Sequence, residues 1–295
     1  MKPSRVYQHC VWIVNTLRQY KKLTLAQINE LWIKDMVSDG NKLDRNSFRR
    51  HTDAILNMFG IIIEHEDVTY KYYIANPEVL GDGTMEGWML STLTVSTVLT
   101  DSLSLRDYIL LENVPAGQEF LQAIILAIKT RRRIKIHYQK FGCEGSDKVI
   151  APYALKLFHQ RWYLLSHTGN HFATYSLDRM QMVQITDEPF EMPADFKPES
   201  YFTEYFGVLT DDTPMAHVEV HAYGKTANYL RTLPLHHSQR EIESNDEYTK
   251  FSFDIRPTDD FLGQLLSHGD GIKVISPDDV REQMKQKIAE NLKRY

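Results

Sequence analysis

Residues 151–180 read APYALKLFHQRWYLLSHTGNHFATYSLDRM, and their pattern indicates the secondary structure of the central part of the chain. Apolar and polar side chains alternate within it. A period of two is typical of β-strands, because successive side chains of a strand point to opposite faces of a sheet. The alternation predicts strands that begin near Val149, Arg161 and Phe172, with turns between them.

The same period continues on both sides of this stretch. Residues 134–138 (IKIHY) precede it, and residues 180–185 (MQMVQI) follow it. Five short strands within about fifty residues are too few to bury two separate sheets. We therefore predict a small, curled β-barrel in this part of the chain.

The motifs of this segment, taken in order, resemble the WYL-domain family, which is named after a Trp-Tyr-Leu triplet. The resemblance covers residues 131–186 and rests on Ile134 with Tyr138, on residues 151–155 (APYAL), on residues 161–165 (RWYLL) and on residues 175–180 (YSLDRM). It implies an SH3/Sm-like barrel in a transcription regulator. It also implies that the barrel binds an anionic ligand, a nucleotide or a single-stranded oligonucleotide, and that this ligand modulates the binding of operator DNA.

The charge of the segment agrees with an anionic ligand. The chain has a net charge of -5, but residues 131–181 carry 9 Lys and Arg against 3 Asp and Glu. A local cationic excess attracts anions. Resemblance and charge together predict ligand contacts from Tyr138, Lys156, His159, Arg161, Tyr163, Ser176 and Arg179.

Two positions of this set leave alternatives open. Asp178 and Arg179 are neighbours, and Arg commonly forms buried ion pairs, so a structural role for Arg179 stands beside the ligand-binding role. Ser176 departs from the family, many members of which carry a basic side chain there. The run of three arginines at 131–133, together with Lys135, Lys156 and His159, is expected to compensate for this loss.

The N-terminal part of the chain has helical periodicity. Apolar residues predict a first helix over residues 5–20. A capping box at residues 24–27 starts a second helix, and Asp44 caps a third helix over residues 45–59. Two short strands follow around the turn at residues 66–69, which is the order of a winged helix.

We predict that residues 1–78 form a winged helix that binds duplex DNA. The third helix of such a unit fits a major groove, where Arg and Asn pair with base edges, while the wing contacts the DNA backbone. The buried face of this helix is predicted to comprise Phe48, Thr52, Ile55, Leu56 and Phe59. The predicted DNA contacts are Arg45, Asn46, Ser47, Arg49, Arg50 and Lys71. The alternative is a helical domain whose outer face is only solvated.

Residues 79–130 are predicted to form two apolar helices, over residues 84–103 and 117–130, joined by a turn near Pro115. An apolar helical linker between domains is a common place for dimerisation, so we expect a homodimer. The alternative is that these helices pack on their own chain.

Residues 211–295 are predicted to follow the order β-α-β-β-α-β of a ferredoxin-like module, with a final helix. This segment also resembles the C-terminal extension of WYL regulators, the WCX type, at residues 238–239 (SQ) and 274–277 (VISP). The chain is thus predicted to be an α+β multidomain protein with a winged helix (1–78), a helical linker (79–130), a WYL domain (131–210) and a ferredoxin-like module (211–295).

The sequence carries no motif of a catalytic centre, so we predict that the protein is not an enzyme and has no cofactor. The pairs His217/His221 and His236/His237 have no Cys or acidic partners at zinc spacing, so no metal is expected. Without an apolar leader or span, the expected location is the cytoplasm. The alternative function is a nucleic-acid-binding accessory or defence-associated protein that uses the barrel as its main binding surface.

Overall fold

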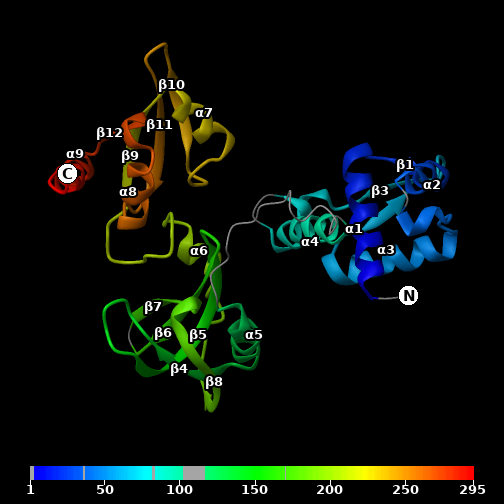
Figure 1. Ribbon diagram of the computed structural model, residues 1–295, viewed down its shortest axis with the longest axis horizontal. Coiled ribbons are helices and arrows are strands. Elements are labelled where there is room, and N and C mark those ends of the chain that lie inside the picture. Colours follow the sequence, from blue (N-terminus) through cyan, green and yellow to red (C-terminus); the bar gives the residue numbers. More distant parts are fainter. Residues whose placement is uncertain (1–2, 36, 82–83, 102–116, 170) are drawn as a thin grey trace. The chain divides into compact units, whose positions relative to one another are not determined.

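The computed structural model describes residues 3–35, 37–81, 84–101, 117–169 and 171–295 (Figure 1). The chain divides into two units, Met1–Glu112 and Asn113–Tyr295. The described residues contain both helices and three small sheets, which confirms the predicted α+β class. None of the described helices has both the length and the apolar character needed to cross a membrane.

The N-terminal unit contains the three helices predicted for residues 1–78 and the first helix predicted for the linker, in chain order. Its elements are α1 (Pro3–Tyr20), β1 (Leu23–Thr24), α2 (Leu25–Lys34), η1 (Val37–Gly40), α3 (Arg45–Phe59), β2 (Ile63–His65), β3 (Lys71–Ile74), η2 (Pro77–Leu80) and α4 (Met85–Asp101). The sheet has the order β1-β3-β2. The two-residue strand β1 was not predicted, because only its pairing with β3 defines it as a strand.

The ends of α2 and α3 lie where the capping signals predicted them. The Thr24 side chain accepts a hydrogen bond from the backbone of Gln27, and the Gln27 side chain accepts one from the backbone of Thr24. Asp44 accepts hydrogen bonds from the N–H groups of Asn46 and Ser47, at 2.9 Å each. Gly60 ends α3 in the left-handed conformation, with φ of 63°. The caps at Thr24 and Asp44 satisfy backbone N–H groups that the start of a helix leaves unpaired, and the Gly60 N–H donates to the Leu56 carbonyl at the end of α3.

The buried face of α3 differs from the predicted one at three positions, since Thr52 was predicted to be buried and is only half-buried. Leu56 was predicted to be buried and is 48% exposed, whereas His51 is buried. The stripe that faces the core is therefore Phe48, His51, Ile55 and Phe59. His51 fills its place in the stripe because its ring packs against the rings of His9 and Trp32.

The two helices of the predicted linker pack on different units. Leu90 of α4 is part of the N-terminal core, and Asn15 donates a hydrogen bond to Thr94 at 3.0 Å. Helix α5 (Leu121–Thr130) instead buries Ile124 and Ala127 against the sheet of the second unit. Each helix thus packs one face on its own chain, and the homodimer stays a prediction. The predicted turn near Pro115 lies outside the described residues.

A five-stranded antiparallel sheet forms the first half of the second unit. Its strands are β4 (Arg132–Tyr138), β5 (Ser146–Phe158), β6 (Arg161–Thr168), β7 (His171–Ser176) and β8 (Met180–Pro189), with the 3-10 turn η5 (Leu177–Arg179) between the last two. Their order in the sheet is β7-β6-β5-β4-β8. All five predicted strands are present, and β5 is longer than predicted because it continues through a register shift between Pro152 and Ala154.

The C-terminal half of this unit follows the predicted order of elements. After α6 (Pro198–Phe202) come β9 (Ala216–Tyr223), α7 (Lys225–Thr232), β10 (Arg240–Ser244), β11 (Tyr248–Ile255), α8 (Asp259–Leu266), β12 (Ile272–Ser276) and α9 (Asp278–Leu292). The antiparallel sheet has the order β10-β11-β9-β12, which agrees with the β-α-β-β-α-β pattern. One face of this sheet forms a core with side chains of α7, α8 and α9.

Candidate ligand-binding site and DNA-facing surface

Arg179 occupies an unusual position in the turn η5. Its guanidinium lies over the ring of Tyr138 at 5.5 Å and over the ring of Phe141 at 4.8 Å. Its Nε is buried and has no hydrogen-bond partner among the described residues. A buried guanidinium donor without an acceptor is unfavourable, and a bound ligand or an ordered water can supply that acceptor.

A cavity of about 490 Å³ adjoins this guanidinium. Its lining supplies four groups that are cations or, in the case of His171, become cations on protonation: Lys140, Lys148, His171 and Arg179. No carboxylate is among the residues that line it. The remaining lining residues are Tyr138, Phe141, Ala173, Thr174 and Tyr175, and Thr174 Oγ1 is a second buried polar atom without a described partner.

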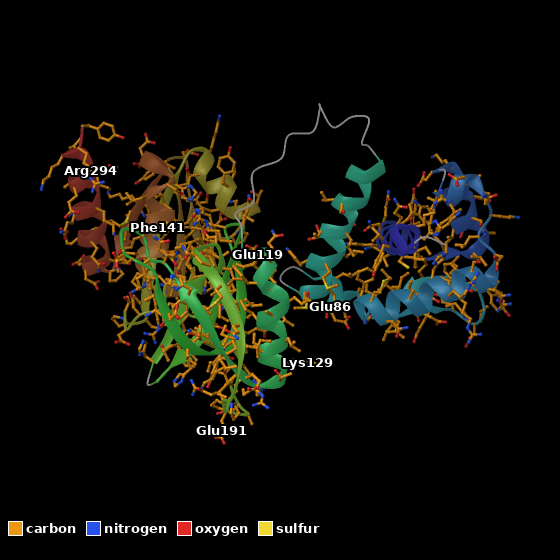
Figure 2. All side chains as sticks on the ribbon, turned by 60° about the horizontal axis from the view of Figure 1, so that its bottom comes forward. Glu86, Glu119, Lys129, Phe141, Glu191 and Arg294 are labelled. Carbon is orange, nitrogen blue, oxygen red and sulfur yellow. The ribbon has the colours of Figure 1, made fainter. Side chains whose placement is uncertain are left out.

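A second, smaller cavity of about 240 Å³ lies beside the first. The two cavities share Lys140, Phe141 and Arg179, so these three side chains separate them. Phe141, labelled in Figure 2, lies in the loop between β4 and β5 and is 76% exposed. The smaller cavity is completed by Gln139, Gly142, Asp178 and Gln181.

The partner of Asp178 is Arg161 rather than the neighbouring Arg179. Arg161 Nη1 lies 3.2 Å from Asp178 Oδ2, and the Asp178 side chain is only 15% exposed. The Ser176 hydroxyl donates a hydrogen bond to the other carboxylate oxygen of Asp178. Ser176 is itself fully buried, and its N–H donates to the hydroxyl of Tyr138 at 3.4 Å. The structural ion pair considered for Asp178 therefore exists, and it leaves Arg179 without a carboxylate partner among the described residues.

Three further predicted ligand residues lie away from both cavities. Lys156 donates a hydrogen bond to the Gly207 carbonyl at 2.6 Å and lies 4.3 Å from the centre of the Phe202 ring. Burial lowers the pKa of Lys156 to about 8. Tyr163 pairs with Lys156 across β5 and β6, and burial raises its pKa. His159 stacks on the ring of Phe158 at 4.1 Å.

The structure thus brings together only two of the seven predicted ligand residues, Tyr138 and Arg179, as lining of the larger cavity. It adds Lys140, Phe141, Lys148 and His171, which sequence reasoning missed. Lys140 and Phe141 could have been found from the sequence, because they lie two and three residues after the motif residue Tyr138. Lys148 and His171 carry no comparable signal, because only the strand pairing brings β5 and β7 to the cavity.

In the N-terminal unit, α3 presents a polar outer face. Arg45, Asn46, Arg49 and Arg50 are exposed on the side opposite the buried stripe. Ser47 is engaged in the helix cap, since its hydroxyl donates to Asp44 at 2.6 Å and accepts from Arg50 at 2.9 Å. The four exposed side chains can reach an external partner without breaking a core contact.

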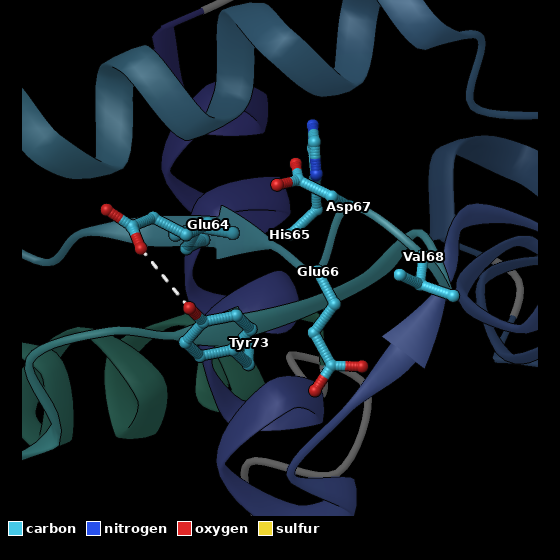
Figure 3. A pocket seen from close by; sticks show the side chains of 7 residues that line it. Glu64, His65, Glu66, Asp67, Val68 and Tyr73 are labelled. Carbon is cyan, nitrogen blue, oxygen red and sulfur yellow. Dashed lines mark hydrogen bonds between the residues drawn. The ribbon is translucent and has the colours of Figure 1, made fainter.

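The hairpin formed by β2 and β3 is acidic at its tip. Figure 3 shows the side chains of Glu64, Glu66 and Asp67 around a surface pocket, with the Tyr73 hydroxyl bonded to Glu64. Glu66 also pairs with Lys22. Lys71, the predicted contact on this hairpin, lies at the start of β3. Carboxylates repel DNA phosphates, so this charge opposes the predicted contact between the wing and the DNA backbone.

The histidine pairs have ordinary partners. His217 lies 2.7 Å from Asp254, His221 stacks on Tyr248, and His236 contacts the Thr203 carbonyl at 2.8 Å. Within the described part of the chain, no group of three or more His, Cys, Asp or Glu side chains could hold a metal ion.

Two family models match the chain. The model of the WYL domain matches residues 119–185, and the model of the WCX domain matches residues 214–292. The first match begins within the segment that precedes α5, upstream of the boundary predicted at residue 131. No match was found among curated proteins.

Two solved structures are similar to the chain at low identity. One is proteasome accessory factor B/C (PafBC) of Arthrobacter aurescens, with 17% identity and a TM-score of 0.37 over 95% of this chain and 45% of that chain. The other is described as a CRISPR Cas-related protein, with 16% identity and a TM-score of 0.40 over 89% of this chain and 76% of that one. The chain therefore spans less than half the length of the PafBC structure.

Proposed function

The chain belongs to the family of proteins with a WYL domain and a WCX extension, and on this premise we propose that it is a transcription regulator that binds duplex DNA and an anionic ligand. The main support for this proposal is the cavity beside Arg179. It gathers four cationic or protonatable groups and no carboxylate, and a buried guanidinium donor at its edge lacks a partner among the described residues. An anion bound there would accept the unpaired hydrogen bond and offset the local positive charge.

The DNA-binding part of the proposal rests on α3. In a winged helix this element is the recognition helix, and its exposed Arg and Asn side chains are the types that pair with G and A in the major groove. Because the β2–β3 hairpin is acidic, we propose that α3, rather than the wing, makes the main contact with DNA. The proposed role of the ligand is to change how the DNA-binding units of a homodimer fit two half-sites.

The homodimer is supported by exposed apolar side chains on both helices of the connecting region. Met85, Trp88 and Val95 are exposed on α4, and Ile125 and Leu126 are exposed on α5. Exposed apolar side chains of this kind are frequent at interfaces between copies. Light scattering of the full chain is expected to give twice the mass of 34.4 kDa.

The experiment that tests this function measures binding of the full chain to the duplex upstream of its own gene by fluorescence anisotropy. Binding at physiological salt should exceed binding to an unrelated duplex by at least about a thousandfold. Added pyrophosphate or nucleotide should change the affinity for this duplex. Equal affinity for both duplexes, or an affinity that no anion alters, contradicts the proposal.

The acidic hairpin favours a second candidate, an accessory or defence-associated protein that binds single-stranded nucleic acid on its WYL domain. The same assay separates the two candidates. Tight binding to any single strand, with no preference among duplexes, supports the second one, and Lys148→Gln should then weaken that binding while Arg49→Ala leaves it unchanged.

A further inference from the structure

Strand β7 lies at one edge of the five-stranded sheet, because it stands at the end of the order β7-β6-β5-β4-β8. The Ser166 hydroxyl donates to the Ala173 carbonyl at 3.3 Å, so this carbonyl faces β6. The Thr168 hydroxyl likewise donates to the His171 carbonyl at 3.5 Å. In an antiparallel pair, successive residues turn their backbone groups to alternate sides. The N–H and the carbonyl of Thr174 therefore face away from β6.

The outer edge of β7 opens into the larger cavity. Ser176, two residues after Thr174, donates its N–H to the hydroxyl of Tyr138, which lines that cavity. Ala173, Thr174 and Tyr175 also line it. Because the side chains of a strand alternate between its two faces, three consecutive residues share only the edge of the backbone. The described residues supply no partner for Thr174 on this edge, and its buried hydroxyl also has none.

An unpaired strand edge of this kind is a template for another strand. Its N–H and carbonyl groups accept the complementary groups of an extended peptide, which then extends the sheet. An ionised phosphate can accept a hydrogen bond from the N–H of Thr174 but offers no donor to its carbonyl. The backbone of a peptide offers both a donor and an acceptor at each residue, so it satisfies this edge better than an inorganic anion does.

The side chains around this edge favour an acidic peptide. Lys140, Lys148 and Arg179 line the cavity, and His171 adds a group that becomes a cation on protonation. No carboxylate is among the described lining residues. Every second side chain of an added strand points to the same face of the sheet, so acidic residues at alternate positions can approach these cations together. Hydrogen bonds between ionised groups are stronger than those between neutral groups.

We infer that β7 accepts an extended acidic segment of a partner protein as an additional strand. Its backbone pairs with Thr174, and its carboxylates lie beside Lys140, Lys148 and Arg179. This inference goes beyond the small anion of the proposed function, since it assigns a protein partner to the same cavity. The peptide and a small anion need the same cations, so binding of one weakens binding of the other.

The test measures binding of fluorescein-labelled peptides to the full chain by fluorescence anisotropy, with Glu-Val-Glu-Val-Glu as the probe. An analogue with every backbone N–H methylated should bind at least about tenfold more weakly, because it keeps the carboxylates but cannot donate to the strand edge. The analogue Gln-Val-Gln-Val-Gln should also lose at least about tenfold, because it keeps the backbone but has no charged side chains. Unlabelled pyrophosphate should displace the probe.

Two further measurements locate the bound peptide. The probe should slow amide hydrogen exchange over residues 171–176, whereas pyrophosphate should not, since an anion does not pair with the strand edge. Lys148→Gln should weaken binding of the probe by about five- to tenfold. The matched control is Lys129→Gln on α5, an exposed position outside the cavity, which should leave the affinity unchanged.

Equal affinity for the probe and for its N-methylated analogue would show that charge alone drives binding, and would overturn the added strand. The inference also fails if pyrophosphate or a single-stranded pentanucleotide binds while the probe does not, and the anion binding of the proposed function then stands. If none of the three binds, the proposed ligand sensing fails as well.

Discussion

Gly117 lies directly against the backbone of Leu177. A Cβ atom at position 117 would come within 2.6 Å of the Leu177 carbonyl carbon and 2.7 Å of the Asp178 nitrogen. Gly117 also has φ of 105°, a conformation that L side chains rarely adopt. The turn that carries Arg179 is therefore packed against the segment that leads into α5, and this position requires glycine for two separate reasons.

Gly117→Ala should destabilise the second unit by about 2–4 kcal/mol, because strain at positive φ and the clash with the turn add up. It should also weaken pyrophosphate binding, since Leu177 and Asp178 must move and Arg179 with them. Urea denaturation and titration measure the two effects. The matched control is Gly169→Ala, where φ is 64° and no atom lies within 4 Å, so only strain of about 1 kcal/mol is expected. Equal losses in the two variants would show that the contact with Leu177 is not tight.

Arg161→Ala should lower stability more than it lowers ligand affinity. Asp178 is largely buried, and loss of its ion-pair partner leaves a carboxylate that only Ser176 satisfies. Because Arg161 itself is 41% exposed, the expected loss is moderate, about 1–2 kcal/mol of unfolding free energy. A double-mutant cycle with Asp178→Asn isolates the pair. A coupling energy near zero would mean that the ion pair does not hold the turn.

Arg179→Ala should show the opposite pattern. Its Nε has no described partner to lose, so the unfolding free energy should fall by less than about 1 kcal/mol. Pyrophosphate binding should weaken by about 2 kcal/mol, because charge-assisted hydrogen bonds to the phosphate disappear. Calorimetry and titration on one preparation test both parts. A large drop in stability with unchanged pyrophosphate affinity would assign Arg179 to the structure alone.

Arg49→Ala should weaken specific duplex binding by about 1–3 kcal/mol if this side chain reads a base edge from the outer face of α3. Stability should not change, because Arg49 is exposed. Arg18→Ala, in the last turn of α1, is the control for a general loss of positive charge. Anisotropy with specific and unrelated duplexes distinguishes them. The assignment of α3 fails if Arg49→Ala and Arg45→Ala both retain full specific affinity.

His51 should make the stability of the N-terminal unit depend on pH. Burial lowers its pKa from 6.5 to about 4, with smaller contributions from His9 and Arg50 that Asp44 opposes. Between pH 6.5 and 4 the unfolded chain therefore binds a proton that the folded chain does not. The stabilisation is complete above pH 6.5 and is lost as the pH falls towards 4, by up to about 3 kcal/mol.

The measurement compares chemical denaturation of the wild type and of His51→Phe at pH 7.5 and pH 5. Phenylalanine keeps a ring against Trp32 but cannot take up a proton. The loss of stability on acidification should be clearly smaller in the variant. An identical loss in both proteins would show that other groups, with the buried His9 first among them, carry the pH dependence.

Local features of this protein could be predicted from its sequence because their physical causes are local. The caps at Thr24 and Asp44 rest on hydrogen bonds that reach no further than three residues. The left-handed Gly60 and the five strands of the WYL domain follow in the same way, from the freedom of glycine and from a period of two. The resemblance to the WYL family could also be recognised from the sequence, since the motifs that carry it are short and lie in a fixed order.

Which charged groups pair with one another could not be predicted from the sequence and depends on the folded structure. The sequence places Asp178 beside Arg179, yet the carboxylate pairs with Arg161, seventeen positions away, because the strands β6 and β7 are joined by a hairpin that brings them together. Lys148 on β5 and His171 on β7 reach one cavity for a similar reason. Strand register and the path of the β4–β5 loop are set by the packing of the whole unit. The order of residues along the chain does not give these distances in space, and the proposed anion site depends on them.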